Sequence, residues 1–215
     1  MNKITTQGMI DIIAKMSDII IANEVPFCEL DSAAGDGDFG MSIAKGFRQL
    51  KKEWAELETD NIGAFLKSCS MIIMEYCGGA SGPIWGSAFR AGAKAAGDAE
   101  EIGVDGLAEI MQAAVVGIQK TGERSFGRGA VVGDKTLIDA LVPAADSLSA
   151  SAKAGEALLP AMKKSAEAAV AGAEATKLIA ARMGRAGTVG ERSIGYPDAG
   201  AHGLGVIFTE IVNSL

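Results

Sequence analysis

Apolar residues recur every three or four positions along nearly the whole chain, and this spacing constrains the fold more than any other feature. Alternating runs that would predict strands are almost absent, and the best candidate, residues 204–208, is better read as the start of a last helix. Alanine and glycine are abundant, which allows helices to pack closely. The sequence therefore predicts an all-α fold in one domain, residues 1–215, with about eight helical segments: 5–23, a second ending near 58, 61–77, one from 83, 104–120, 134–149, 155–183 and one after 200.

Side chains at the expected helix starts support these boundaries. Asp60 or Asn61 can accept hydrogen bonds from the first turn of the third helix, and Asp134 from the first turn of the sixth. Pro83 suits the first turn of the fourth helix, and Pro143 can kink the sixth. Binding residues tend to be carried on loops, and four of the loops between these helices are Gly-rich and charged: 30–40, 78–82, 121–133 and 184–200.

The charge balance excludes some classes of protein. The chain has 27 Asp and Glu residues against 20 Lys and Arg, so its formal net charge is −7. Nucleic-acid binding needs a surplus of basic residues, so a general nucleic-acid partner is not expected. No apolar run reaches the roughly 18 residues that span a bilayer, and no segment resembles a signal peptide. We therefore expect a cytoplasmic protein without a membrane partner.

The cysteines predict neither a disulfide framework nor a zinc site, because Cys28, Cys69 and Cys77 lack any CxxC spacing. Cys69 and Cys77 stand in an apolar helical stretch, where a free cysteine behaves as a small buried hydrophobe. We expect both in the core.

The loop at 30–40 carries Asp31, Asp36 and Asp38 and contains no Lys or Arg. Its three glycines let the backbone turn tightly enough for the carboxylates to converge. Converging carboxylates repel one another without a cation, and Mg²⁺ prefers oxygen ligands that it often shares with phosphates. The loop indicates either a divalent-cation site or a solvated acidic turn in which each Asp caps a neighbouring amide. The ligand series and terminal Glu of an EF-hand are missing.

Two further Gly-rich segments precede helices. Residues 78–83, Gly-Gly-Ala-Ser-Gly-Pro, place bare amides where the helix dipole favours anions, although such a turn needs no ligand. Residues 133–136 read Gly-Asp-Lys-Thr. Near the last loop, an Arg could neutralise phosphate or pair with Glu191 at the surface. His202, the only histidine, excludes a His-rich metal site, and whether it has a direct role stays open.

Together, four blocks resemble the nucleotide-binding L subunit of dihydroxyacetone kinases and the equivalent domain of their single-chain versions. The resemblance covers essentially the whole chain, and the order and separation of the blocks make it far more specific than any one of them. The blocks are Leu30-Asp31 with Gly35-Asp36-Gly37-Asp38-Phe39-Gly40; Gly78-Gly79-Ala80-Ser81-Gly82-Pro83; Gly133-Asp134-Lys135-Thr136; and Gly184-Arg185-Ala186 with Gly190-Glu191-Arg192-Ser193-Ile194-Gly195.

The resemblance implies an eight-helix antiparallel barrel that holds ADP or ATP at one end through two Mg²⁺ ions. By motif position, it implies that Asp31, Asp36 and Asp38 are the metal ligands and that Arg185 faces the transferring phosphate as the catalytic residue. The positions that would line the nucleotide are Phe39, Gly40, Ser42, Gly79, Ala80, Ser81, Gly129, Leu137, Asp198, Ala199 and Gly200.

In such kinases the ketose is held by a separate K subunit or domain through a histidine that this chain does not supply. The resemblance therefore implies half of an active site, which presents a phosphate to a ketose hydroxyl in glycerol metabolism. Coupled versions keep ADP bound and receive phosphate from a phosphotransferase-system M subunit, whereas others exchange ATP for ADP. The phosphate source, the ketose (dihydroxyacetone or another such as erythrulose) and a homodimer stay open.

Two departures from the family pattern matter. Phe39 stands where the phosphotransferase-coupled versions have His and several ATP-using ones have Cys, so any polar role there is lost. Gly37 and the absence of that His weakly favour the type that exchanges ATP for ADP. The turn Asp198-Ala199-Gly200-Ala201 lacks the family's proline. An alternative function is a non-catalytic nucleotide sensor that regulates a partner protein. A larger fatty-acid kinase would need further domains that this length excludes.

Overall fold

A computed structural model describes residues 2–184 and 186–215, and most of these residues are helical, as predicted. Its strands are two residues long: β1 (Ile4–Thr5) pairs antiparallel with β2 (Glu101–Ile102). Residues 204–208 are helical, as predicted, but they lie inside α9, which begins at Ala199, rather than at its start. The α-helices of the described residues are α1 (Thr6–Ala22), α2 (Glu24–Ser32), α3 (Phe39–Lys52), α4 (Ile62–Tyr76), α5 (Ser81–Ala96), α6 (Val104–Phe126), α7 (Ile138–Lys153), α8 (Leu158–Ala175) and α9 (Ala199–Asn213).

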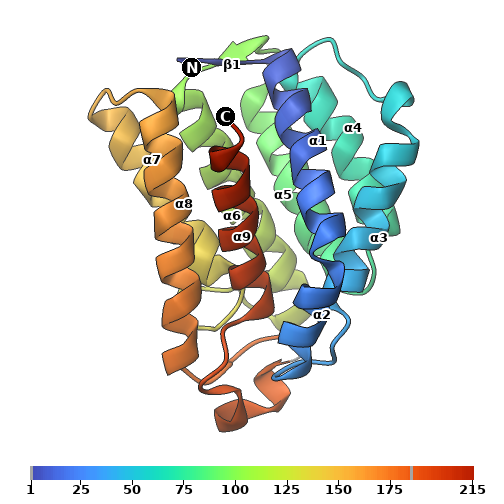
Figure 1. Cartoon of the computed structure of the whole chain (residues 1–215), viewed down its shortest axis with the longest axis vertical. Helices are drawn as coiled ribbons and strands as arrows, with labels where there is room; N and C mark the ends of the chain where they lie inside the picture. Colours follow the sequence, from blue (N-terminus) through green and yellow to red (C-terminus); the bar gives the residue numbers. More distant parts are fainter. Residues whose placement is uncertain (1, 185) are drawn as a thin grey trace.

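The helices pack in chain order. From α3 to α9, each helix contacts the next along the chain, and α1 contacts both α3 and α9, which closes the series. Successive long helices run in opposite directions, as the colours of Figure 1 show. The short α2 lies at the lower end of the view, against α3 and α9. No described helix has the length and apolar character needed to cross a membrane.

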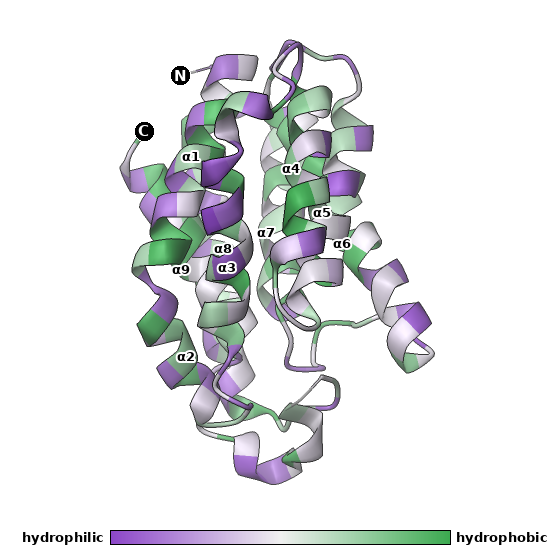
Figure 2. Ribbon diagram, turned by 90° about the vertical axis from the view of Figure 1, so that its right-hand side faces the viewer, coloured by the Kyte–Doolittle hydropathy of each residue, from purple (hydrophilic) through white to green (hydrophobic). Residues whose placement is uncertain are grey.

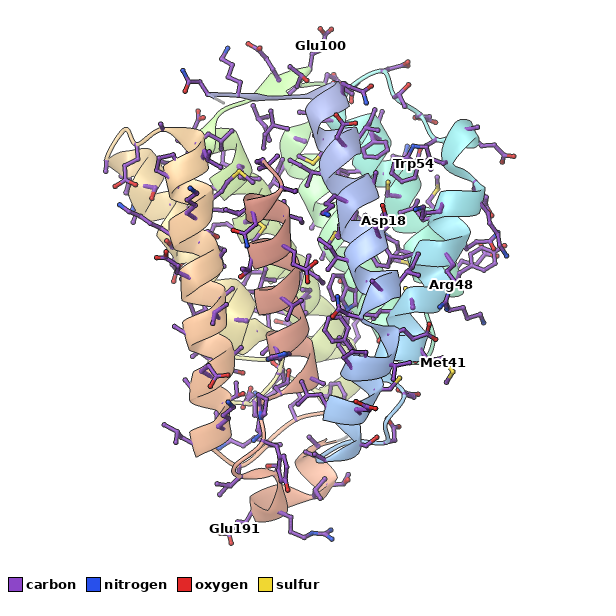
Figure 3. The ribbon with its side chains drawn as sticks, in the orientation of Figure 1. Asp18, Met41, Arg48, Trp54, Glu100 and Glu191 are labelled. Atoms are coloured by element: carbon purple, nitrogen blue, oxygen red, sulfur yellow. The ribbon has the colours of Figure 1, made fainter. Side chains whose placement is uncertain are left out.

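This alternation gathers the Gly-rich loops at one end of the molecule. The connections 33–38, 77–80, 127–137, 176–184 and 186–198 all lie at the lower end in Figure 1, whereas the two ends of the described chain lie at the upper end. Figure 2 shows the same arrangement from the side, and Figure 3 places Met41 and Glu191 toward the lower end and Trp54 and Glu100 toward the upper one. Segments far apart in sequence are thus brought to one surface.

The core gathers large apolar side chains from several helices, among them α3 and α4, together with many alanines of α7 and α8. Phe47 and Phe65 are fully buried, and Phe47 makes an edge contact with Trp85 of α5 at 6.0 Å between ring centroids. Cys69 and Cys77 are buried as predicted, and desolvation raises the pKa of both thiols to about 12. Both thiols therefore stay protonated and act as apolar packing groups.

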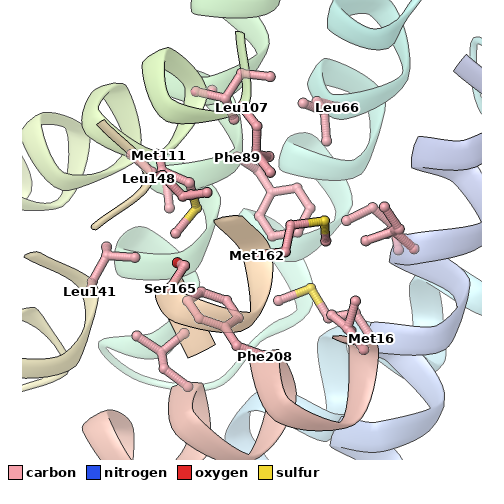
Figure 4. Close-up of a pocket in the computed structure, with 18 of the residues that line it drawn as sticks. Met16, Leu66, Phe89, Leu107, Met111, Leu141, Leu148, Met162, Ser165 and Phe208 are labelled. Atoms are coloured by element: carbon pink, nitrogen blue, oxygen red, sulfur yellow. The ribbon is translucent and has the colours of Figure 1, made fainter. Parts of the chain in front are cut away.

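An apolar cavity of about 180 Å³ lies inside the ring of helices. Figure 4 shows side chains from several helices pointing into it, among them Met16, Phe89, Met162 and Phe208. Its lining offers almost no polar atoms apart from Ser165, whose hydroxyl donates to the carbonyl of Ala144. The cavity lacks the groups that phosphate or metal chemistry needs, so the candidate site lies elsewhere.

Several helix boundaries differ from the predictions. The helix α2 was not predicted; it contains Pro26 in its first turn, where proline is tolerated. The second predicted helix ends at Lys52 rather than near 58, and the long seventh ends at Ala175, before a 3₁₀ turn. The fifth continues to Phe126, so part of the predicted 121–133 loop is helical. Asn61, not Asp60, caps α4, and its Oδ1 accepts from the Ala64 amide at 2.8 Å.

The interpretation of Asp134 as a helix cap is wrong. The helix α7 begins only at Ile138, because Gly133 and Lys135 have φ of +99° and +62° and interrupt any helix there. Asp134 instead accepts two hydrogen bonds from the Arg128 guanidinium, one of them at 2.8 Å, and another from the Val131 amide at 2.9 Å. These bonds hold its pKa below the ordinary value. Asp134 therefore folds the preceding loop back on itself.

Candidate metal and nucleotide site

Asp31, Asp36 and Asp38 converge at the lower end of the molecule. One carboxylate oxygen from each lies within 4.8 Å of the other two. Asp31 is in the last turn of α2 rather than in the loop, and Asp38 is the N-terminal cap residue of α3. Two helices and the turn between them thus position the three carboxylates. The cluster offers the oxygen donors and the concentration of negative charge that suit Mg²⁺.

The turn between these helices is held by Asp31. Its Oδ2 accepts from the amides of Asp38 at 3.1 Å and Phe39 at 3.4 Å. A Cβ at Gly35 would collide with the Asp31 carboxylate, so only glycine lets the turn wrap so closely. Gly37 has φ of +76°, a conformation that glycine adopts without strain. The glycines predicted to make the carboxylates converge do so.

Burial raises the pKa of the Asp31 carboxyl above its ordinary value, and repulsion from Asp36 raises it further. The hydrogen bond from the Phe39 amide opposes both effects. The local field thus disfavours adding more negative charge and favours a cation. A divalent ion between these carboxylates would relieve the repulsion.

The Gly78–Pro83 segment lies directly beside α3. The Gly78 amide donates to the Ser42 carbonyl at 3.0 Å, and a Cβ at Gly78 would come within 2.8 Å of the Ser42 hydroxyl oxygen. Gly79 and Ala80 are exposed at the start of α5, and a Cβ at Gly79 would meet no atom within 4 Å. This segment therefore presents open backbone and helix N-terminal amides next to the turn that leads from Asp38 to Ser42, a setting that suits phosphate.

Phe39 and Gly40 form the first turn of α3. The Phe39 ring packs away from the carboxylates, 5.8 Å from the ring of Phe27 between centroids and in van der Waals reach of Gly203 on α9. The Phe39 amide, in contrast, faces Asp31. The residue therefore serves the site through its backbone, and its side chain joins α2, α3 and α9.

Replacing Phe39 with leucine is expected to lower the free energy of unfolding by about 1 kcal/mol, because part of the ring contact with Phe27 is lost. The affinity for Mg²⁺–nucleotide is expected to stay within about threefold, since the amide that faces Asp31 is retained. Urea unfolding and calorimetric titration measure the two quantities. A large loss of affinity with little loss of stability would show that the ring itself contacts the nucleotide.

The Asp198–Gly200 turn leads into α9, which contacts α2, the helix that carries Asp31. Asp198 caps α9, accepting from the Ala201 amide at 2.8 Å, and its own amide donates to the Thr176 hydroxyl at 2.8 Å. A Cβ at Gly200 would come within 3.1 Å of Leu137, so two predicted nucleotide positions from distant loops lie together. Leu137 also lines the apolar cavity.

Desolvation raises the pKa of Asp198 to about 7, helped by repulsion from Asp139 and Asp31 and opposed by the Ala201 amide and by Lys135. Of the three clustered carboxylates, Asp31 thus acts on the charge of Asp198. A group with such a pKa changes its charge near neutral pH.

Replacing Asp198 with asparagine is expected to flatten the pH dependence of stability between about pH 4 and 7. In this range the folded protein holds a proton on Asp198 that the unfolded chain, with a pKa near 3.8, has lost. The contribution of Asp198 to the free energy of unfolding therefore increases as the pH falls from about 7 and levels off near the unfolded pKa. Asparagine keeps the capping oxygen. Urea unfolding at several pH values tests this, and parallel curves for both proteins would contradict it.

Two predicted positions stand apart from these contacts. Gly129 packs against α6, where a Cβ would come within 3.1 Å of Gln119, and Gln119 donates to the neighbouring carbonyl of Ala130 at 3.0 Å. Arg185, predicted as the catalytic residue, lies outside the described residues. His202 lines a separate pocket between α8 and α9, together with Glu174 and Glu210.

Comparison with known proteins assigns the family. The DAK2 domain matches residues 33–213, and the chain belongs to the DAK2 domain family. Within that family, the chain is 34% identical over 186 residues to the ADP-binding subunit DhaL of PEP-dependent dihydroxyacetone kinase 1 from Listeria innocua, covering 86% of this chain and 85% of that protein. The family resemblance read from the four blocks is therefore confirmed.

Two larger proteins are also similar. The L-erythrulose kinase of Pectobacterium atrosepticum is 32% identical over 196 residues, covering 90% of this chain and 32% of that protein. The crystal structure of the dihydroxyacetone kinase from C. freundii in complex with AMP-PNP and Mg²⁺ matches with a TM-score of 0.71 and 25% identity, covering 96% of this chain and 34% of that one. The chain thus spans about a third of each of these two kinases.

Proposed function

We propose that this protein is the nucleotide-binding subunit of a dihydroxyacetone or related short-ketose kinase, acting in the cytoplasm with a separate ketose-binding K subunit. The observation that carries this proposal is the convergence of Asp31, Asp36 and Asp38 at the end where the Gly-rich loops meet. Family membership supports it, since the similar Listeria protein is named an ADP-binding subunit.

In this proposal the three carboxylates bind two Mg²⁺ ions, and the backbone of Gly79, Ala80 and Ser81 receives the phosphates. Leu137 and Gly129 lie toward the base, and the Asp198–Gly200 turn covers the nucleotide. The ring of helices is then the eight-helix antiparallel barrel that the resemblance implies, forming one domain over residues 1–215. Contacts between Gly78 and Ser42 and between Leu137 and Gly200 support this placement.

Phosphoryl transfer in such a site needs positioning and charge stabilisation more than covalent chemistry. Bound Mg²⁺ would neutralise charge on the phosphates. The helix N-terminus at Ser81 supplies amides and a favourable dipole, and Arg185 is proposed to stabilise the phosphoryl group in transfer. The partner subunit holds the ketose that carries the acceptor hydroxyl, and it supplies the group that removes the proton of that hydroxyl.

The nucleotide that the purified protein retains tests the phosphate source. We would denature the protein, identify any released nucleotide by chromatography, and titrate the stripped protein with ADP and ATP in the presence of Mg²⁺ or EDTA. Retained ADP supports a stored cofactor that a phosphotransferase-system M subunit rephosphorylates. An empty protein that binds Mg²⁺–ATP reversibly supports an ATP-using subunit. No binding of either would overturn the proposed function.

A transfer assay separates catalysis from nucleotide sensing. Phosphate transfer to dihydroxyacetone or erythrulose is measured with and without a K-type partner, using the same nucleotide-loaded protein. Transfer that needs the partner supports the kinase function. Nucleotide binding without transfer would instead support a sensor that regulates another protein.

A further inference from the structure

Lys135, in the Gly-Asp-Lys-Thr block, has no place in the proposed phosphate site, yet it is among the most deeply buried side chains, with 1% of its surface exposed. Its ammonium nitrogen lies within hydrogen-bond distance of four backbone carbonyls, which share its three N–H donors: Thr176 at 2.9 Å, Ile179 at 3.1 Å, Ser193 at 2.6 Å and Tyr196 at 2.8 Å. None of these acceptors is a carboxylate. A cation is costly to bury, so a cage of carbonyls that replaces its hydration indicates a specific role.

The backbone around Lys135 is built to aim this side chain inward. Lys135 has φ of +62°, the only positive φ of a non-glycine residue in the described chain, and such a conformation is unfavourable for a long side chain. The buried Asp139 carboxylate holds the turn by accepting from the amides of Gly133 at 2.6 Å and Thr136 at 2.8 Å. The strain is therefore offset by the hydrogen bonds that the block donates to Asp139 in the first turn of α7.

The four carbonyls come from the two ends of one connection. We call residues 176–179 and 193–196 the neck of the segment between α8 and α9, because the chain leaves through the first and returns through the second. Besides Lys135, the neck is joined by a hydrogen bond from the Gly195 amide to the Lys177 carbonyl at 2.8 Å. The Ala181 amide also donates to the Ser193 hydroxyl oxygen at 2.9 Å.

The neck is connected directly to the candidate site. The carbonyl of Thr176 accepts from the Lys135 ammonium group, and its hydroxyl oxygen accepts from the Asp198 amide. One residue therefore links the ammonium group to the Asp198–Gly200 turn. Lys135 also lowers the pKa of Asp198 by attraction through space. The other end of the Gly-Asp-Lys-Thr block leads into Leu137, which contacts Gly200.

We propose that Lys135 is a positioning residue for phosphoryl transfer: its ammonium group closes the neck and thereby fixes the Asp198–Gly200 turn beside the carboxylate cluster. This inference rests on the proposed function of that site. A methionine of similar length would leave four carbonyls without their donor, so the neck would open while the surrounding helices keep their packing.

The test compares Lys135→Met with Lys177→Met in the full chain. The control removes an ammonium group from the same neck, but one that is partly exposed and pairs with Glu174 at the surface. Amide hydrogen exchange is measured for peptides that cover residues 176–200 and for peptides of α4. Calorimetry gives the Mg²⁺ affinity, and a transfer assay with a K-type partner gives kcat and the KM for nucleotide. For Lys135→Met we expect faster exchange confined to 176–200 and a loss of kcat of roughly 10- to 100-fold, with Mg²⁺ affinity within about threefold.

Two results would overturn the inference: a kcat of Lys135→Met within about twofold of the control, or exchange that increases equally in α4, which would show a general structural role. If Lys135→Met does not fold, Thr176→Val replaces it. Valine removes the hydroxyl that accepts from the Asp198 amide and donates to the Ala173 carbonyl, and it leaves the Thr176 carbonyl position for Lys135. The same local exchange and a smaller loss of kcat are then expected, and unchanged exchange there would overturn the inference. If the wild-type protein binds no nucleotide, the proposed function fails, whereas the exchange comparison still decides whether Lys135 closes the neck.

Discussion

Replacing Asp38 with alanine is expected to weaken Mg²⁺–nucleotide binding by at least about 100-fold, because even the loss of an outer-shell partner of a metal commonly costs 10- to 100-fold. Asp38 contributes one of the three clustered carboxylates, and its side chain makes no capping hydrogen bond to α3. Helix content by circular dichroism should therefore stay unchanged while calorimetry shows the loss of affinity. The two readouts together separate a ligand from a structural residue.

The control for this substitution is Asp60→Ala. Asp60 is exposed in the connection between α3 and α4, at the end of the molecule opposite the cluster. This substitution removes the same charge as Asp38→Ala. It should leave the affinity for Mg²⁺–nucleotide within about twofold, since salt screens an exposed charge that lies far from the cluster. Nucleotide affinity retained in Asp38→Ala, or lost equally in Asp60→Ala, would remove the basis for the metal assignment.

Replacing Gly40 with alanine is expected to damage both stability and metal binding. A Cβ at Gly40 would collide with the Glu24 carbonyl oxygen and come within 2.9 Å of the Cys28 amide nitrogen, so α2 and α3 must move apart. Such overpacking commonly costs about 1–3 kcal/mol in the free energy of unfolding. Because Asp31 is on α2 and Asp38 begins α3, the shift also separates two of the three carboxylates. We expect the affinity for Mg²⁺ to fall by roughly tenfold or more. Calorimetric titration measures this affinity, and urea unfolding of the same samples measures the free energy of unfolding.

Gly8→Ala is the matched control. Gly8 lies in the first turn of α1, and a Cβ there would be 3.5 Å from Ile4, an ordinary contact. Alanine favours the helix over glycine, so stability should be unchanged or increased by up to about 1 kcal/mol, with Mg²⁺ affinity unaffected. Equal stability of Gly40→Ala and the wild type would mean that α2 and α3 do not pack as described.

Local pattern was sufficient for much of the fold. The apolar periodicity predicted the long helices, and Asn61 and Pro83 marked two of their starts. The helix α2 was missed because it is short, contains a proline and has a weak apolar stripe, so its residues resemble a loop when read alone. Tertiary contacts of α2 with α3 and α9 hold it in place, and these contacts leave no trace in local spacing.

The carboxylates of the candidate site were predicted from the sequence, whereas the contacts of Lys135 and Asp134 were not. The three carboxylates are close in sequence, so a short loop was enough to bring them together. The role of Lys135 could not be read from its neighbours, because its hydrogen-bond acceptors lie 41 to 61 positions further along the chain. Asp134 was misread for a different reason: its partner Arg128 is only six positions away, but the positive φ of Gly133 and Lys135, which prevents a helix from starting there, was not predicted.

The separation of the termini from the carboxylate cluster has a practical consequence. The chain enters through β1 and leaves after α9 at the same end of the molecule, and the Gly-rich loops occupy the other. A tag or a tether to a sensor surface, attached at either terminus, therefore leaves the loops facing the solution. Immobilised protein can then be exposed to nucleotide, metal and a K-type partner in turn, and the order in which they must be added can be measured on one surface.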